Sequence, residues 1–328
     1  MPLLTSQQRF HTVISGEKIR PPLFPEGLRE GVLQGWRSQG FLRRKKLENI
    51  FHYDTFEELD IATDLRLTYQ DWPTDGRGLR DLRSRIDPED PRWLPKDWSQ
   101  KVKRWAQRDY PLFLVVHDGL FLTMGISDGA SFTQAMVTLW KDRAYVEELL
   151  ELQAEFEGGL AERLLREVSF DAAIFSEPIA SHQGTLISPK MYAELVLPSY
   201  DPLLDTLRSN GVQTVIWRSY ANPRLLLPAV FAGERFDCLW ACETNPVDMD
   251  YLAIRRELGD HFSLMGGIDV DWLYGDPGLI RGRLEATVTP LLEQGRYIPL
   301  ADGRVREGVP YPNYVAYREA LEAIVGVS

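Results

Sequence analysis

Hydrophobic and polar positions alternate in blocks along the C-terminal two thirds of the chain. Short apolar runs of strand length recur there, at residues 112–116, 172–175, 212–217, 236–241, 262–265 and 297–300. Each run is apolar nearly throughout, which is the pattern of a strand buried on both faces. Amphipathic segments separate the runs, and residues 142–168 repeat apolar side chains at helical spacing with Glu and Arg opposite. The alternation predicts parallel strands connected by helices.

Local signals mark the boundaries of one further helical segment. Ser188 followed by Pro189 predicts an N-cap with proline at the first helical position. Asn210 and Gly211 predict the C-terminal stop. Two prolines lie between, at 198 and 202, so we expect two helices or one kinked helix.

The number of strands favours a closed barrel. Six strands after residue 110 are too many for one half of a doubly wound fold. We therefore predict one α/β domain, a (β/α)8 TIM barrel over residues 1–328. Residues 1–110 are expected to contribute the first strands and a cap, and residues 111–328 the core barrel. Phe24 is expected in the first strand, and another strand within residues 51–69. Residues 71–98, with many Pro, Asp, Arg and Trp, predict an irregular excursion over one barrel end.

Composition narrows the classes of function. The chain has 328 residues, 44% of them hydrophobic, and a formal net charge of −11, which argues against nucleic-acid binding and against an anionic membrane surface. Cys238 and Cys242 are its only cysteines, too few for a secreted disulfide scaffold or, by themselves, a zinc site. No signal peptide or membrane span is expected. We therefore expect a cytoplasmic protein that acts on a small molecule.

Polar side chains follow nearly every predicted strand. Barrel enzymes place their catalytic groups at the carboxyl ends of strands. A carboxylate drawn into that mouth loses water, and the resulting rise in its pKa suits it to act as a general acid or base. The alternative is a carboxylate that pairs with an arginine and only holds loops. The catalytic candidates on this basis are Glu177, Asp302, Glu243 and His182.

Substrate-binding candidates occupy the same positions. The planar fork of Arg218 suits a carboxylate or phosphate, and the alternative is an ion pair with Glu177 or Glu243. A histidine there either shuttles protons or is structural, and an aspartate after two glycines either binds substrate or caps the next helix. The full set is Arg218, His117, Tyr220, Asp269 and Arg304.

Several segments resemble the uroporphyrinogen decarboxylase superfamily. The likeness covers roughly residues 95–325, and its blocks are GTLISPKMY at 184–192 with LPSY at 197–200, MGGID at 265–269, GRYIP at 295–299 with PYPNY at 310–314, and Trp98, Lys101 and Lys103 in a helix before the next strand. Taken together and in order, these motifs are fairly specific for the superfamily. They imply the barrel fold and do not select the reaction.

The chain departs from both well-defined branches of that superfamily. The decarboxylases carry an arginine-rich segment near the N-terminus, where residues 24–31 here read FPEGLREG. The zinc methyltransferases carry HxCG after the fourth strand and a later cysteine; the corresponding residues here are RSYA at 218–221 and a position near Asp302. The resemblance therefore implies no zinc at this position. Whether Glu177, His182, Glu243 and Asp302 hold another divalent ion stays open.

Three functions remain open. The first is methyl transfer from a small methylated compound, with or without an anionic group, to a thiol or to a corrinoid carried by a partner protein. In it Glu177 or Asp302 protonates the leaving atom and Arg218 holds an anion. The second is decarboxylation of a small or porphyrin-like carboxylate. The third is a binding protein that has kept the barrel and lost its chemistry. The corrinoid partner is implied by the resemblance alone.

Overall fold

The computed structural model describes residues 4–41, 46–61, 65, 72–244 and 247–327. The chain divides into two compact units. Unit 1 consists of Met1–Phe56, Asp109–Pro111 and Cys238–Ser328, and unit 2 of Glu57–Arg108 and Leu112–Asp237.

Unit 2 contains a sheet of parallel strands that follow one another in chain order: β1 (Glu57–Asp60), β2 (Leu112–His117), β3 (Ala172–Glu177) and β6 (Val215–Tyr220). All residues of β2 are buried, as its apolar run predicts. The strand predicted within residues 51–69 is β1. Strands β3 and β6 continue beyond their apolar runs into polar residues, so the hydrophobic pattern alone places their carboxyl ends too early.

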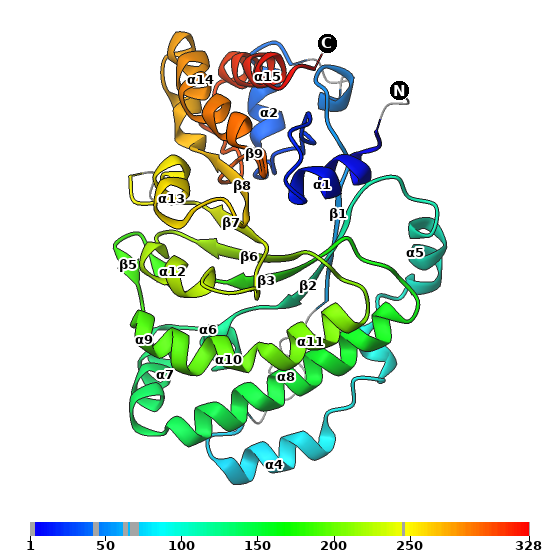
Figure 1. The fold of residues 1–328 in the computed structure, drawn as a ribbon, viewed down its shortest axis with the longest axis vertical. Coiled ribbons are helices and arrows are strands. Elements are labelled where there is room, and N and C mark those ends of the chain that lie inside the picture. The colour runs from blue at the N-terminus through cyan, green and yellow to red at the C-terminus, as the bar shows by residue number, and fades with distance from the viewer. Residues whose placement is uncertain (1–3, 42–45, 62–64, 66–71, 245–246, 328) are drawn as a thin grey trace. The chain divides into compact units, whose positions relative to one another are not determined.

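Helices cover one side of this sheet. The long α8 (Arg143–Leu165) begins at Asp142, whose carboxylate accepts from the Tyr145 N–H at 3.1 Å. It packs along α11 (Asp201–Ser209), and in Figure 1 both helices run past β2, β3 and β6. Unit 2 also contains α6 (Leu120–Thr123), α7 (Gly129–Lys141), the hairpin of β4 (Ala180–Ser181) and β5 (Gly184–Thr185), η4 (Arg224–Leu226) and α12 (Leu227–Val230).

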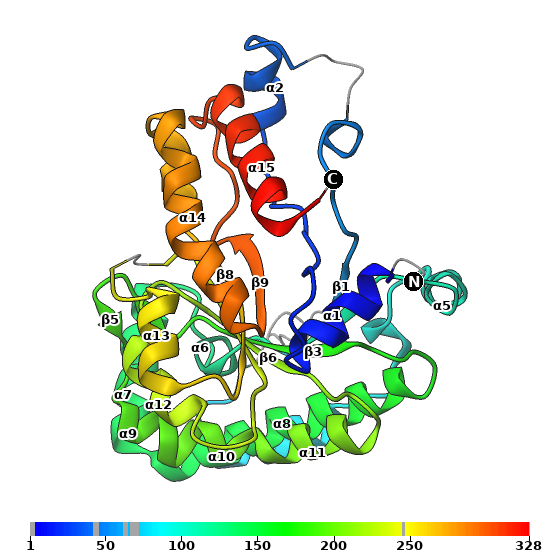
Figure 2. The same cartoon turned by 45° about the horizontal axis from the view of Figure 1, so that its top comes forward.

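The helical segment predicted after Ser188 is confirmed. Ser188 caps α9 (Pro189–Met191) by accepting from the Met191 N–H at 3.1 Å, and α11 stops at Asn210. Between them lie a π-helical turn, η3 (Tyr192–Val196), and α10 (Leu197–Ser199). Figure 2 shows this run alongside α8. The prolines are accommodated because each lies in the first turn of α9, α10 or α11, where a missing N–H costs no hydrogen bond.

The excursion expected at residues 71–98 is more regular than predicted. Residue 71 lies outside the described residues, and the rest includes α4 (Gly76–Arg85) and η2 (Pro91–Trp93), followed by α5 (Trp98–Trp105). Asp75 caps α4 by accepting from the Gly78 N–H at 2.7 Å, and α4 packs against α8. The expectation of an irregular segment was wrong because Asp75 and Asp90 cap helices and Pro91 lies in the first turn of η2.

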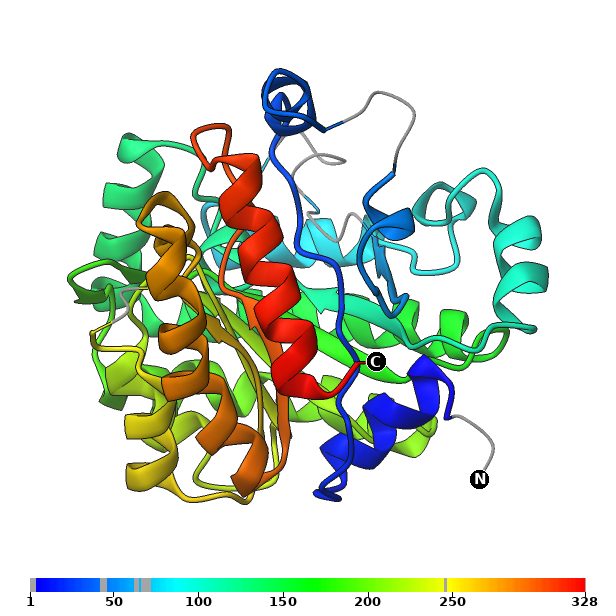
Figure 3. The same ribbon diagram turned by 90° about the horizontal axis from the view of Figure 1, so that it is seen from above.

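Unit 1 repeats the same pattern with β7 (Cys238–Cys242), β8 (Ser263–Ile268) and β9 (Tyr297–Ala301), which pair in parallel and in chain order. Helices α13 (Tyr251–Leu258) and α14 (Pro277–Gln294) and the 3-10 helix η5 (Val270–Tyr274) connect them. The chain ends in α15 (Tyr311–Val325), which packs along α14; Figure 3 shows them side by side in red and orange.

The N-terminal part of unit 1 contains α1 (Ser6–Ile14), α2 (Val32–Arg37) and η1 (Leu47–Asn49). Phe24 is fully buried but lies in no strand, so its placement in a first strand was wrong. The neighbouring prolines at 21, 22 and 25 have no N–H to donate to a ladder. The described contact of strand type in this region is a single parallel bridge between Leu28 and Val305.

The predicted fold class is confirmed: the chain is α/β, and each unit is built from the sequential parallel strands and connecting helices that make up a (β/α)8 barrel. The carboxyl ends of these strands are therefore the places to examine for chemistry. The division into one domain with a cap stays a prediction.

Candidate active site

The carboxyl ends of β1 and β6 bring charged side chains to one face of the unit 2 sheet. Glu58 and Asp60 lie two residues apart on β1, and Arg218 and Tyr220 lie two apart on β6. Side chains alternate between the faces of a strand, so each pair shares a face. On β3, Ser176 lies opposite Arg218 in the register, and its hydroxyl is 3.4 Å from that of Tyr220.

Arg218 is engaged by a residue that the hydrophobic pattern did not identify. Its Nη1 donates to both carboxylate oxygens of Glu58, at 3.1 and 2.9 Å. The guanidinium side chain is 13% exposed and that of Glu58 is 25% exposed, so the pair is largely shielded from water. The structure pairs Arg218 with Glu58 of β1 and not with the predicted alternative partners, Glu177 and Glu243. Substrate binding by Arg218 stays a prediction.

A second carboxylate of β1 has a perturbed affinity for protons. Burial raises the pKa of Asp60 above its ordinary value, the charge of Asp118 raises it further, and Glu58 adds to the effect. Only the charge of Arg218 acts in the opposite direction among these neighbours. We refer to Glu58, Asp60 and Asp118 as the carboxylate cluster. It places three acidic side chains beside one guanidinium at the strand ends.

Sequence reasoning missed Glu58 and Asp60 as site residues. The signal was present: the strand reads Glu57-Glu58-Leu59-Asp60, with carboxylates two apart around one buried leucine. Two polar residues at strand spacing place both on one face. Asp118 directly follows β2, but it was not selected from the sequence.

Glu177 lies on the opposite face of the sheet from Arg218. The register pairs it with Ser219, one residue beyond Arg218, and its side chain is fully buried against the covering helices. One oxygen accepts from the Leu120 N–H at 3.0 Å. The other accepts from the hydroxyls of Tyr200 and, at 3.3 Å, Tyr192.

Burial raises the pKa of Glu177 above its ordinary value, and the charge of His117 opposes this rise. The sequence placed this carboxylate in the barrel mouth, which was wrong because alternation turns it toward the helices. Its hydrogen bonds to Leu120, Tyr192 and Tyr200 favour a role in holding these segments in place. A direct catalytic role for Glu177 stays a prediction.

His117 belongs to the same buried layer. Its Nδ1 lies 3.0 and 2.9 Å from the two carboxylate oxygens of Glu157 on α8, and the Gln153 side-chain amide donates to Glu157 at 2.8 Å. Burial alone lowers the pKa of His117, but Glu157 reverses this and the pKa is raised. Nε2 is buried and has no hydrogen-bond partner among the described residues. His117 therefore faces the helix layer, and its predicted contact with substrate is not supported by its position.

The remaining candidate of unit 2, His182, lies in the turn between β4 and β5. Its side chain is exposed. The hairpin is held to the end of β6, since the Asn222 N–H donates to the Ser181 carbonyl at 3.1 Å. The structure does not bring His182 into the buried layer around Glu177. Its catalytic role stays a prediction.

In unit 1, Asp302 ties the ends of three strands together. One carboxylate oxygen accepts from the Val270 N–H at 3.1 Å, and the other from the N–H and hydroxyl of Thr244 at 3.0 and 2.7 Å. The residue is buried, so these bonds occupy the carboxylate. Asp302 thus holds loops, as in the alternative that the sequence left open, but through Thr244 and Val270 and not through an arginine; its catalytic role stays a prediction. Glu243 is different: its side chain is 46% exposed and pairs with Arg29 at 3.3 Å.

The other two unit 1 candidates have distinct positions. Asp269 accepts from the Asp271 N–H at 2.9 Å and so caps η5, as the alternative to substrate binding predicted. Burial raises the pKa of Asp269, and the charges of Asp302 and Asp271 act in the same direction. Arg304 is exposed, with its stem against Gly27. Substrate binding by both stays a prediction.

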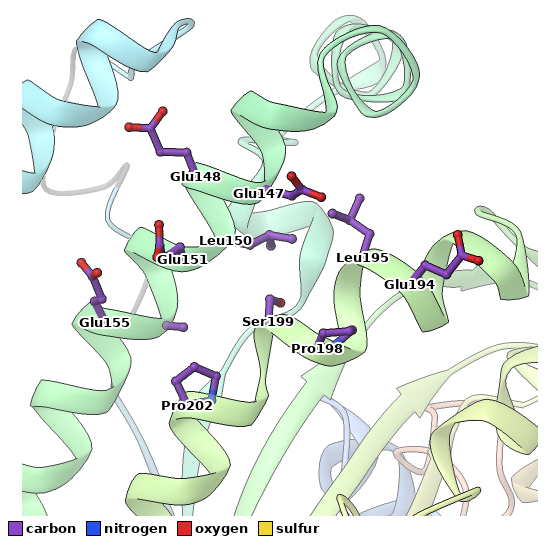
Figure 4. A pocket seen from close by; sticks show the side chains of 11 residues that line it. Glu147, Glu148, Leu150, Glu151, Glu155, Glu194, Leu195, Pro198, Ser199 and Pro202 are labelled. Carbon is purple, nitrogen blue, oxygen red and sulfur yellow. The ribbon is translucent and has the colours of Figure 1, made fainter.

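Unit 2 also has a surface groove of about 610 Å³ between α8 and the helical run of η3, α10 and α11. Its floor includes Leu150 and Leu195, and Figure 4 shows glutamates of α8 rising along one side. The acidic side chains already face cations: Glu147 pairs with Arg143 at 2.8 Å, while Glu151 and Glu155 share Arg83 at 3.4 and 3.3 Å. No candidate residue of the sequence analysis lines this groove. It therefore carries no argument about the reaction.

Two properties of the described part of the chain bear on its class. No three His, Cys, Asp or Glu side chains there lie close enough to hold a metal ion. The expected absence of zinc stays a prediction. None of the described helices is long and apolar enough to cross a membrane.

Comparisons with known proteins give no family. No family model matches the chain, and no curated protein matches it. Among solved structures, it is similar to a glycosylated endo-beta-1,4-xylanase of glycoside hydrolase family 10 from Gloeophyllum trabeum, with 11% identity and a TM-score of 0.44 over 81% of this chain and 95% of that one. So distant a likeness carries no argument about activity. The resemblance to the uroporphyrinogen decarboxylase superfamily therefore stays a prediction.

Proposed function

We propose that this protein is an enzyme that removes a methyl group from a small N-methylated amine, which it binds and activates as the ammonium form, at the carboxylate cluster of unit 2. The observation that supports this is the charge balance at the strand ends. Among the residues that the structure describes around Asp60, the carboxylates of Glu58, Asp60 and Asp118 face one guanidinium, that of Arg218, which already binds Glu58. Such a cluster attracts a cation and repels an anion.

Asp60 has the property that the transfer needs. Its raised pKa keeps a larger fraction protonated than an ordinary aspartate at the same pH. In the proposed step Asp60 gives its proton to the substrate nitrogen, which becomes an ammonium group. The sulfur of a thiol acceptor then attacks the methyl carbon and its S–H proton passes to the Asp60 carboxylate. The electron pair of the broken carbon–nitrogen bond stays on nitrogen, which leaves as a neutral amine.

Asp118 and the ionised Asp60 stabilise the positive charge on nitrogen during this step. Arg218 keeps Glu58 paired and fixes the edge of the cluster. The identity of the acceptor rests on the superfamily resemblance alone, which implies a thiol or a corrinoid on a partner protein. Decarboxylation is favoured less, because a carboxylate substrate has to enter a cluster with excess negative charge and compete with Glu58 for Arg218.

Ligand binding to the full-length protein tests the charge preference. We expect choline and trimethylamine to raise the thermal midpoint, and the neutral tert-butyl isostere of choline to have no comparable effect. Small carboxylates are expected to bind more weakly than the ammonium compounds, and Asp118→Asn to weaken the ammonium ligands selectively. Stabilisation by carboxylates and not by ammonium ligands would contradict the proposal and favour decarboxylation.

Turnover tests the role of Asp60. With a methyl-labelled amine and a thiol acceptor, Asp60→Asn is expected to lower kcat by about 10²- to 10⁴-fold, the usual contribution of a positioned acid. In the wild type, kcat/KM is expected to fall as the pH rises through the raised pKa of Asp60, because the acid loses its proton. Exposed Asp81 on α4, changed to Asn, is the control. Equal activity of the Asp60 and Asp81 variants would remove Asp60 from the mechanism.

A further inference from the structure

The loop that follows β2 is fastened at both ends by buried carboxylates. At its start, His117 Nδ1 is bound by both oxygens of Glu157, at 3.0 and 2.9 Å. At its end, the Leu120 N–H donates to Glu177 at 3.0 Å. The two carboxylates come from different elements, α8 and β3. They therefore fix the loop against the helix layer on one side and the sheet on the other.

Each carboxylate is itself held in place. Glu157 accepts a second bond from Gln153 at 2.8 Å, one turn earlier on α8. Glu177 is bound by Tyr200 and Tyr192, and the Trp217 indole N–H donates to the Tyr192 hydroxyl at 3.0 Å. The fastening thus continues into α8, the η3–α11 run and β6. A small movement of the loop requires several buried hydrogen bonds to break together.

Asp118 is the residue at the middle of this fastened loop. Its charge raises the pKa of Asp60. It also lies close enough to His117 and Glu157 for its charge to raise the pKa of each. Its side chain is half-buried while His117 is 2% exposed. The loop therefore connects the buried layer on the helix side with the carboxylate cluster on the other face.

The buried His117–Glu157 pair holds the loop after β2 at a cost in desolvation free energy. Taking His117 and Glu157 out of water costs free energy, and well-packed apolar side chains often serve stability as well or better. The His117–Glu157 pair also fixes an orientation, because two hydrogen bonds to fixed carboxylate oxygens set both the position and the rotation of the imidazole ring. Direction matters where a neighbouring group has to be held within a few tenths of an ångström of its working position.

We propose that His117, Glu157 and Glu177 are positioning residues, which together fix Asp118 beside Asp60 in the carboxylate cluster. This assigns Glu177 and His117 a role behind the site rather than in contact with the substrate. The inference rests on the proposed function only in treating the cluster as the reacting site. The fastening of Asp118 itself can be measured without any substrate.

The titration of Asp60 reports where Asp118 lies. Among the described residues, the charges that act on Asp60 are those of Asp118, Arg218 and Glu58, so a displaced Asp118 removes a neighbour that raises its pKa. The experiment uses full-length protein labelled with ¹³C at the aspartate carboxyl carbons and follows each carbon by NMR against pH. The Asp60 signal is identified as the one that Asp60→Asn removes. Asp118→Asn sets the size of the full effect.

Glu157→Gln and Glu177→Gln are the test variants. In each, we expect the titration midpoint of Asp60 to fall toward 3.8, its ordinary value, by a large part of the fall seen in Asp118→Asn. Glu151→Gln is the matched control, because Glu151 lies on the exposed side of the same helix as Glu157. That control is expected to leave Asp60 unchanged. With an active substrate, kcat should fall by on the order of 10²-fold in the test variants with little change in KM.

A softer variant covers the case in which a glutamine variant fails to fold. Gln153→Leu removes one donor to Glu157 without leaving a buried charge unpaired, and it is expected to shift Asp60 in the same direction by a smaller amount. An Asp60 midpoint that stays raised in the folded variants would overturn the inference, whatever ligands bind. Failure of every ammonium ligand, together with the expected shift, would overturn the proposed function and leave the inference intact.

Discussion

Gly119 occupies a position in unit 2 that leaves no room for a side chain. A Cβ there would lie 2.8 Å from Glu177 Oε1, 2.8 Å from Pro178 Cδ and 2.9 Å from the Ser176 carbonyl oxygen. Its backbone also has φ +91° and ψ 163°, a region that is nearly restricted to glycine. Both constraints follow from the approach of the β2 loop to the end of β3. Glycine is therefore what allows Glu177 to receive the N–H of the next residue.

We expect Gly119→Ala to destabilise the protein by about 2–3 kcal/mol, because it adds backbone strain and displaces Glu177. Urea denaturation monitored by tryptophan fluorescence measures the change. Gly129→Ala is the matched control, since Gly129 begins α7 and a Cβ added there would meet no atom within 4 Å. The control is expected to be neutral or slightly stabilising. If Gly119→Ala changes the free energy of unfolding no more than Gly129→Ala does, the loop after β2 accommodates the added methyl group.

Helix α15 is fastened to the N-terminal segment of unit 1 through one buried ion pair. Arg318 and Glu26 have fully buried side chains, 3.0 Å apart. Glu26 also accepts from the hydroxyls of Tyr317 at 2.7 Å and Tyr314 at 2.9 Å. Arg318 donates to the His52 carbonyl at 2.6 Å. The helix thus joins two segments that are far apart in the sequence.

Arg318→Met is expected to cost about 3–5 kcal/mol, because it leaves the Glu26 carboxylate buried without its counter-charge. The double variant Glu26→Gln/Arg318→Met should recover part of this loss, since it removes the stranded charge. Arg281→Ala is the control: Arg281 forms an exposed pair with Glu285 on α14, and its loss should cost no more than about 0.5 kcal/mol. A double variant less stable than Arg318→Met would mean that hydrogen bonding and not charge dominates.

Across the whole molecule, buried groups with raised pKa values couple stability to pH. Burial raises the pKa of Glu157 and Glu177, and Glu157 raises that of His117 against the opposing effect of burial. Each of these groups binds its proton more tightly in the folded chain than in the unfolded one. Stability from them is therefore complete below the ordinary values of 4.5 for Glu and 6.5 for His, and is lost as the pH rises above them.

We expect the free energy of unfolding to fall as the pH rises from 4.5, by at most about 1.4 kcal/mol per pH unit for each proton released. His52 acts in the opposite direction, because burial lowers its pKa. The difference between the wild type and Glu177→Gln isolates one group, and the variant should show the shallower dependence. Denaturation at a series of pH values measures both slopes. Parallel slopes would mean that Glu177 has the same pKa in the folded and unfolded chains, which would contradict its raised pKa.

The sequence was informative wherever one physical factor dominated. Runs that are apolar throughout, such as those of β2 and β9, correspond to strands because burial on both faces is their main requirement. Strand β1 could not be placed, since only Leu59 of its residues is buried. The site was harder still: Arg218 meets Glu58 across 160 positions of sequence, and a strand pattern does not state which face carries Glu177. Both depend on the register between strands, which single-chain periodicity does not contain.

The π-helical turn of η3 has a consequence for the count of residues along its helix. Tyr192 and Tyr200 are eight positions apart, which in a regular α-helix separates side chains by about 80° around the axis. A π turn takes up one extra residue, so the two tyrosines align as residues seven apart would, about 20° from one line. Both hydroxyls can then reach the single carboxylate of Glu177. The two tyrosines therefore converge on Glu177 because the helix contains one extra residue in its π turn, and not because of any property of the tyrosines themselves.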